Sequence, residues 1–208
     1  MQTKLEKLIS QYRELGIDKQ IDYDKFYLYS LITHSTAIEG STITELENQI
    51  MFDQGISLKG KSMAELNMNL DLKNAYENAV KLANTHADIS IDLLKDFSAL
   101  VMKNTGQEYK TALGAFSSAR GELRLLNVTT GIGGKSYMNY SKVPAKLSEF
   151  CVWLNKEREN YTHKSTIQLY EISFDAHYHL ATIHPWADGN GRMARLLMNM
   201  LQFEFGLI

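Results

Sequence analysis

A single cysteine, Cys151, occurs among the 208 residues of this chain, so an intramolecular disulfide is excluded. A lone thiol is typical of proteins kept in a reducing compartment. No apolar run approaches the roughly 20 residues that a membrane-spanning helix needs, and the polar, amphipathic N-terminus does not resemble a signal peptide. We therefore expect a cytoplasmic protein that does not bind a membrane.

An excess of charge is also missing. The chain has 22 basic and 24 acidic residues, a net charge of −2, and no broad basic patch. This argues against nucleic acid as a partner, because affinity for the phosphate backbone depends on clustered Lys and Arg. Only two prolines are present, so few positions force a helix to break.

Apolar residues recur at helical spacing through most of the sequence. Thr44 with Glu47 and Ser62 with Glu65 form capping boxes that open two helices, and Pro144 suits the start of another. Further periodic segments cover residues 5–15, 93–101, 147–154 and 169–183. With no repeat, no low-complexity run and no linker, the pattern predicts one all-α domain with a substantial core.

Residues 184–195, which read HPWADGNGRMAR, carry the densest chemistry. Gly189 and Gly191 flank Asn190, and an amphipathic helix begins there. Glycines allow a close backbone approach to a ligand, and the first turn of a helix presents unpaired N–H groups to an anion. A lone Gly-Asn-Gly is usually only a turn, so the neighbouring residues decide its interpretation.

Those neighbours suit a nucleoside triphosphate. Arg192 and Arg195 share a helix face, and guanidinium forks match phosphate oxygens. Asp188 is suited to hold Mg²⁺ bridging two phosphates, and His184 is the group that accepts a proton at neutral pH. Taken singly, paired arginines usually form a solvated face and a histidine before proline usually ends a helix. Together, within twelve residues, they predict phosphate chemistry.

The segment resembles the signature of the Fic family, HPFx(D/E)GNGRxxR, and departs from it only at Trp186, where the family has Phe. The resemblance implies a Fic-type helical bundle with one small β-hairpin flap. It also implies transfer of AMP from ATP to a Ser, Thr or Tyr hydroxyl of a protein target, including the chain itself.

The resemblance further implies a role for each residue of the signature. His184 is the general base and Asp188 holds Mg²⁺. The remaining matched positions bind phosphate: Gly189, Asn190 and Gly191 as an anion hole, Arg192 and Arg195 as clamps on the β- and γ-phosphates.

A second resemblance lies upstream, where residues 35–40, STAIEG, fit the family's inhibitory pattern (S/T)xxxE(G/N). Ser35 and Glu39 are four residues apart and share a helix face, and Gly40 suits the position that ends a helix. By itself such a hexamer is also compatible with an ordinary helix end. Beside the signature, it implies that Glu39 occupies Arg195 and inhibits the enzyme.

A third, weaker match covers residues 121–140. Two short apolar runs surround a glycine-rich turn, which predicts a β-hairpin. The family has such a hairpin, the flap, which clamps the target segment as an added strand, and Thr130, Gly131 and Ile132 would lie near its tip. The alternative is an ordinary surface hairpin.

The whole chain, 1–208, is thus expected to be one Fic domain, with N-terminal helices over about 1–60 and the core over about 61–208. Family domains usually continue beyond residue 208 with another helix, so we expect a minimal or a C-terminally truncated member. Removal of AMP from a target, use of another phosphate-containing donor, and nucleotide-binding regulation without turnover stay open. The sequence specifies neither the target nor an oligomeric state.

A metal site built from His177, His179 and His184 is disfavoured. Residues two apart on a helix point about 200° apart, so His177 and His179 do not easily share one metal ion.

Overall fold

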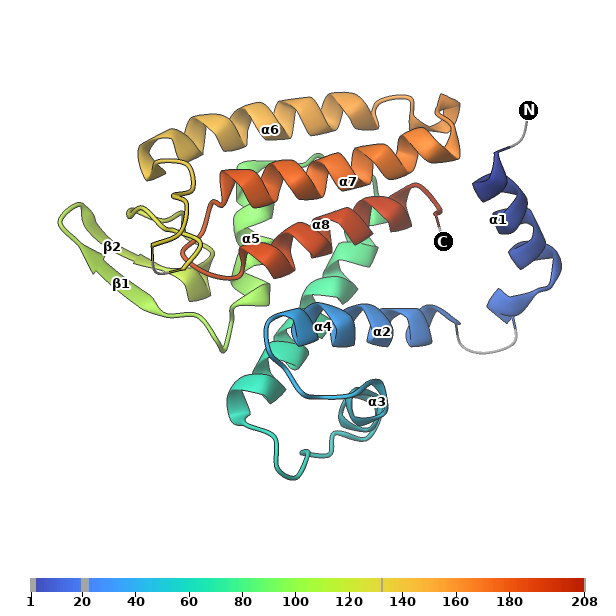
Figure 1. The fold of residues 1–208 in the computed structure, drawn as a ribbon, viewed down its shortest axis with the longest axis horizontal. Coiled ribbons are helices and arrows are strands. Elements are labelled where there is room, and N and C mark those ends of the chain that lie inside the picture. Colours follow the sequence, from blue (N-terminus) through green and yellow to red (C-terminus); the bar gives the residue numbers. More distant parts are fainter. Residues whose placement is uncertain (1–2, 20–22, 132, 208) are drawn as a thin grey trace.

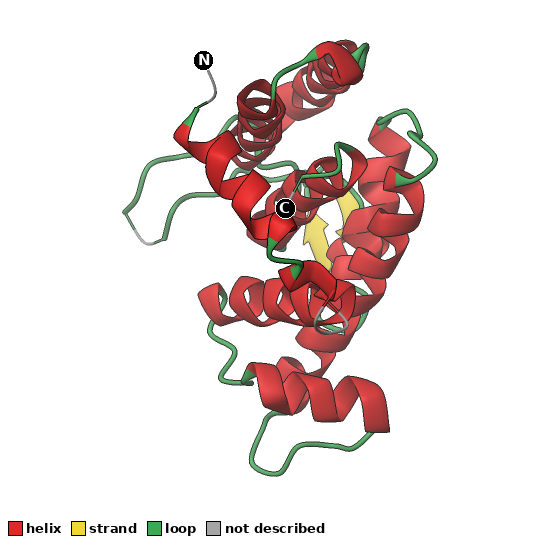
Figure 2. Ribbon diagram, turned by 90° about the vertical axis from the view of Figure 1, so that its right-hand side faces the viewer, coloured by secondary structure: helices red, strands yellow, loops and turns green. Residues whose placement is uncertain are grey.

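Helices form nearly all the regular structure in the computed structural model, which describes residues 3–19, 23–131 and 133–207 (Figures 1 and 2). The elements, in chain order, are α1 (Lys4–Glu14), α2 (Tyr23–Ile38), α3 (Glu45–Gln54), α4 (Met63–Ala83), α5 (Ile91–Val101), β1 (Glu108–Thr111), β2 (Gly114–Ser117), α6 (Val143–Arg158), α7 (Thr166–Ile183) and α8 (Asn190–Glu204). The prediction of an all-α fold with one small hairpin is confirmed.

Local sequence signals explain where the helices begin. The capping boxes predicted at Thr44 and Ser62 open α3 and α4, each with the reciprocal Glu hydrogen bonds. Pro144 lies in the first turn of α6, where its missing N–H costs nothing. The two capping boxes satisfy backbone donors that a helix leaves unpaired at its N-terminus, and the proline removes one such donor.

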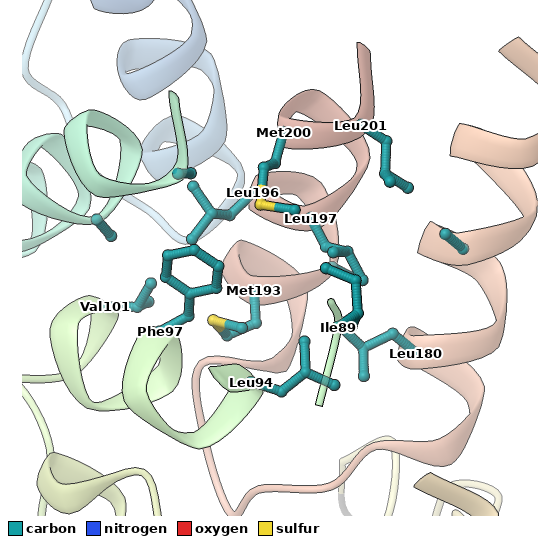
Figure 3. Packing of buried hydrophobic residues seen from close by; sticks show 14 of the residues in the cluster. Ile89, Leu94, Phe97, Val101, Leu180, Met193, Leu196, Leu197, Met200 and Leu201 are labelled. Atoms are coloured by element: carbon teal, nitrogen blue, oxygen red, sulfur yellow. The ribbon is translucent and has the colours of Figure 1, made fainter. Parts of the chain in front are cut away.

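Helix α8 lies at the centre of the core, between α4 and α7 (Figure 1). Its apolar side packs Met193 and Leu197 among residues of α5 and α7, as Figure 3 shows. The opposite, polar side is covered as well, because Asn199 donates a 2.6 Å hydrogen bond to the buried Tyr76 hydroxyl of α4. Because polar side chains of α8 are directed into the protein, this helix does more than pack apolar residues together.

The helix predicted near the N-terminus forms as α1, with a capping box at Thr3, and the chain turns at Gly16 with φ of +60°. None of its residues is buried, and Leu8 and Leu15 are more than half exposed. Figure 1 shows α1 standing apart from the bundle. It therefore contributes no side chain to the core.

The small hairpin is not where the sequence predicted its strands. β1 and β2 pair antiparallel from Glu108 with Ser117 to Thr111 with Gly114. In the predicted segment, 121–140, the pairing is reduced to one isolated bridge, Thr129 with Ser136. Two backbone hydrogen bonds flank this bridge, from the Thr130 N–H to the Lys135 carbonyl and from the Tyr137 N–H to the Val128 carbonyl, both at 3.0 Å. Farther from the loop tip, the carbonyls of Leu126 and Met138 accept hydrogen bonds from the Arg124 side chain.

No helix among the described residues combines the length and hydropathy needed to cross a bilayer.

Candidate active site at the junction of α7 and α8

His184 terminates α7 in a conformation that only a few per cent of non-glycine residues adopt. Its φ and ψ are 53° and 63°, in the left-handed region. Such strain costs about 1–3 kcal/mol and is concentrated at functional sites. The turn directs the chain away from the helix axis directly after the predicted base.

The His184 imidazole is held in a defined orientation. Its Nδ1 lies 3.4 Å from the Ala181 carbonyl oxygen, and the Tyr137 ring stacks on it at 3.6 Å between centroids and 15° between planes. Burial lowers the pKa of His184 below its ordinary value, because desolvation disfavours the imidazolium. A neutral ring with the proton on Nδ1 leaves Nε2 as the basic nitrogen.

The loop from α7 to α8 is braced from inside. Trp186 is fully buried, and its indole N–H donates to the Gly121 carbonyl at 3.0 Å. The Asn190 side chain accepts from the Trp186 N–H at 3.0 Å and donates to its carbonyl at 2.9 Å. Asn190 therefore uses its amide to shape the loop, and its contribution to an anion hole falls to its backbone N–H.

Backbone geometry at the start of α8 requires glycine. Gly189 has a φ of +80°, and a Cβ there would lie 2.6 Å from the Met102 sulfur. The Gly189 N–H donates to an Asp188 carboxylate oxygen at 2.6 Å. Asp188 itself is exposed at the N-terminal end of α8. The first turn of this helix thus presents N–H groups and a positive dipole end beside a carboxylate.

Arg192 is a buried and poorly satisfied cation. It is 4% exposed, and its Nη1 and Nη2 donate to the Val101 carbonyl at 3.3 Å and the Met102 sulfur at 3.0 Å. Its Nε has no hydrogen-bond partner among the described residues. Burial lowers the pKa of Arg192 because the charge is desolvated. Such a guanidinium has unused capacity for an anion.

Arg195, one turn further, binds the end of α2 and the residue that follows it. Its Nε donates to the Ser35 hydroxyl at 2.8 Å, and its Nη2 donates to the Ser35 carbonyl at 3.0 Å and to a Glu39 carboxylate oxygen at 2.6 Å. Gly40, with φ of +97°, follows directly after Glu39 as the sequence predicted. The structure therefore joins the two predicted motifs, although more than 150 residues separate them.

The Glu39 carboxylate also lies against the first turn of α8. A Cβ built on Gly191 would be 2.8 Å from the Glu39 Oε1 atom. A carboxylate at this place is a negative group held at a helix N-terminus, the position where phosphates bind. Glu39 thus borders the predicted anion site and holds one of its two arginines.

The predicted flap residues Thr130 and Gly131 are exposed at a loop tip, and Gly131 has a φ of +95°. Ile132 lies outside the described residues. The Thr130 N–H donates to the Lys135 carbonyl at 3.0 Å, which closes the tip. Because Tyr137 stacks on His184, this end of the loop lies beside the residue predicted to act as the general base.

The two other histidines of α7 point to different surroundings. His179 contacts the Trp153 ring of α6 edge-on at 4.8 Å, and burial lowers the pKa of His177. In the described part of the chain no three His, Cys, Asp or Glu side chains form a metal cluster.

Sequence reasoning missed one residue that organises this region. Arg124 is 1% exposed and its Nε donates to the His184 carbonyl at 2.8 Å. No local signal could have found it, because neither the burial of Arg124 nor a carbonyl partner 60 positions away is visible in the sequence.

The model of the Fic/DOC family matches residues 88–202. The chain belongs to the Fic/DOC family. The match includes α7, the braced loop and the start of α8, where the candidate site lies.

Two curated relatives are protein adenylyltransferase fic-1 of Caenorhabditis elegans, 30% identical over 185 residues, and protein adenylyltransferase Fic of Drosophila melanogaster, 33% identical over 178 residues. The alignments cover 88% and 84% of this chain, but the chain spans only about a third of each relative. A Fic domain protein from Bacteroides thetaiotaomicron shares the fold, with a TM-score of 0.78 and 22% identity over 99% of this chain and 76% of that one.

Proposed function

We propose that this chain is a protein adenylyltransferase, which transfers AMP from ATP to a Ser, Thr or Tyr hydroxyl of a protein. The observation that carries the proposal is the grouping at the α7–α8 junction. A half-buried histidine with a lowered pKa lies beside a helix N-terminus and an underused, buried arginine. The curated relatives at 30–33% identity carry the same activity in their names.

In this reaction the hydroxyl oxygen attacks the α-phosphorus of ATP and its proton passes to Nε2 of His184. The bond from the α-phosphorus to the bridging oxygen breaks, and pyrophosphate leaves with the electron pair. The N–H groups of Asn190 and Gly191, with Arg192, would hold the phosphates, and the Gly189 N–H would join them once it is released from the Asp188 carboxylate. Catalysis then comes chiefly from positioning and charge stabilisation.

Asp188 is the residue proposed to hold Mg²⁺. Its carboxylate is exposed beside the proposed phosphate site, and one of its oxygens makes no hydrogen bond in the described part of the chain. A single carboxylate suits Mg²⁺, which takes its other ligands from phosphate oxygens and water. Bound there, the ion would neutralise charge on the triphosphate.

Glu39 is proposed to inhibit this reaction. Its hydrogen bond occupies Arg195, the arginine assigned to the γ-phosphate, and its negative charge borders the site of the triphosphate. ATP bound beside this carboxylate would have its α-phosphate misaligned for in-line attack. The exposed loop at Thr130–Gly131 is proposed to clamp the target segment as an added strand.

ATP labelled at the α-phosphate tests the proposal, with ATP labelled at the γ-phosphate as its matched control. Both are incubated with the unmodified chain and with the Glu39→Gly variant, because the reverse reaction would use Glu39 to orient water, and protein-bound label is measured after denaturation. We expect α-label and no γ-label on the protein. γ-Label would indicate a different transfer reaction, release of AMP from a previously modified protein would indicate the reverse activity, and saturable ATP binding without any label would indicate a regulator without turnover.

A further inference from the structure

All three guanidinium nitrogens of Arg124 donate hydrogen bonds to backbone carbonyls. Nε donates to His184 at 2.8 Å, Nη1 donates to Leu126 at 2.7 Å, and Nη2 donates to Met138. The backbone N–H of Arg124 also donates to the Pro185 carbonyl at 3.1 Å. Arg124 therefore ties two points of its own loop, at Leu126 and Met138, to the α7–α8 junction 60 positions further along the chain.

The set of partners is unusual for a buried cation. Arg124 is 1% exposed, and no charged neighbour contributes to its lowered pKa, which follows from burial alone. Buried charges are normally paired with an opposite charge. Here three carbonyls take that place, so the position demands the planar fork of an arginine and not merely a positive charge.

The three carbonyls lie on the proposed base and on both limbs of the loop beside it. One is the carbonyl of His184, whose left-handed backbone needs an external restraint. The second, Leu126, lies on the limb of the 121–140 loop that leads out to its tip. The third, Met138, follows directly after Tyr137, which stacks on the imidazole.

We propose that Arg124 is a positioning residue for His184, which fixes the backbone turn of the base and holds Tyr137 against its ring. The proposal rests on His184 being the base of the proposed transfer reaction. Arg124 touches neither nucleotide nor target in this scheme. It acts by keeping the imidazole in one orientation between the α8 N-terminus and the loop that is proposed to receive the target.

Nuclear magnetic resonance of the free protein tests the positioning without any assay of activity. An aromatic face stacked at 3.6 Å shifts the ring protons of His184 upfield, whereas exposed His163 provides a reference. His184→Gln assigns the signal. We expect Tyr137→Phe to retain the upfield shift and Tyr137→Leu to abolish it. Arg124→Lys should move the signal most of the way toward its position in Tyr137→Leu.

The matched control is Arg158→Lys. Arg158 is another buried arginine, 8% exposed, but it pairs with Glu204 at 2.9 Å near the C-terminal ends of α6 and α8. It should destabilise the fold without moving the His184 signal. If Arg124→Lys folds and leaves the upfield shift unchanged, or if Arg158→Lys moves it equally, the positioning role is overturned. Arg124→Met is a harsher variant, and should it fail to fold, the Lys variant alone decides.

Kinetics in the Glu39→Gly background provide the second readout. Misplacement of a catalytic group by about 1 Å lowers a rate by roughly 10²-fold. We expect Arg124→Lys to lower kcat on that order while KM for ATP stays within about twofold, because the phosphate-binding residues are untouched. An equal change in KM and kcat would indicate a general structural defect and overturn the proposal. If no variant transfers AMP, the proposed function fails, and the resonance experiment still decides the positioning role.

Discussion

Replacing Glu39 with glycine should increase AMP transfer well above the unmodified chain. In the structure the Glu39 carboxylate holds Arg195 with a 2.6 Å charge-assisted hydrogen bond and lies against Gly191 in the first turn of α8. The substitution releases the arginine and removes the negative charge from the phosphate site. It leaves His184, Asp188 and the backbone of the α7–α8 loop unchanged.

The structure sets the size of the effect. A hydrogen bond between charged groups contributes about 1.5–3 kcal/mol, but the two side chains are 17% and 33% exposed, and solvent screening lowers the value of such a pair. We take about 1–2 kcal/mol for the contact, which corresponds to a factor of about 5–30 in the population of the released state. Relief of like-charge repulsion with the triphosphate adds to this, so about fivefold is the lower bound.

The assay compares initial rates of α-label incorporation at saturating ATP for a short series of variants. Glu39→Gln keeps a polar group but loses the charge, so its rate should lie between the rates of the unmodified chain and of Glu39→Gly. Glu45→Gln is the control, because Glu45 lies six residues further along the chain and its carboxylate pairs with His34, at 3.7 Å, and not with Arg195. Glu39→Gly combined with Arg195→Ala should be slower than Glu39→Gly alone, since the γ-phosphate contact is lost. A folded Glu39→Gly variant with an unchanged rate would refute the inhibitory role.

Three further outcomes follow from the site. Arg192→Ala should weaken ATP binding measured by calorimetry. Arg192→Lys should not restore it, because an ammonium lacks the forked donors of this guanidinium, which is 4% exposed. Equal affinities of the unmodified chain and Arg192→Ala would contradict this. Asp188→Ala should fold normally but lose the response of turnover to Mg²⁺, and a titration that matches the unmodified chain would point to another ligand. Because burial lowers the pKa of His184 below its ordinary value of 6.5, the base form persists further into the acidic range, so the rate should fall to half of its plateau only at a pH below 6.5. A rate already halved at pH 6.5 would contradict that sign.

Local signals predicted the helices and the start of the site well. Capping boxes at Thr44 and Ser62, glycine at position 40 and the glycines around Asn190 all act within a few residues, so their effects are visible in the sequence. The contact between Glu39 and Arg195 was predicted through the family resemblance, and the geometry is confirmed. Its inhibitory effect stays a prediction.

Long-range hydrogen bonding was what the sequence did not reveal. The predicted strands of residues 121–140 have the right apolar pattern, but they pair only at the Thr129–Ser136 bridge, and farther from the loop tip Arg124 binds the carbonyls of Leu126 and Met138. The strands that do form, at 108–111 and 114–117, are short and largely polar on one side, which is a weak signal. Likewise, nothing in the sequence indicates that the Asn190 amide is used up on the backbone of Trp186.

The most direct test of the account is single-turnover AMP transfer by Glu39→Gly with and without His184→Ala, with ATP affinity measured in parallel. His163→Ala, an exposed histidine, is the control. General-base catalysis contributes on the order of 10²–10⁴-fold. We predict a loss of that size for His184→Ala at unchanged ATP affinity and no loss for His163→Ala, whereas transfer by His184→Ala within a few fold of its parent would contradict the central claim.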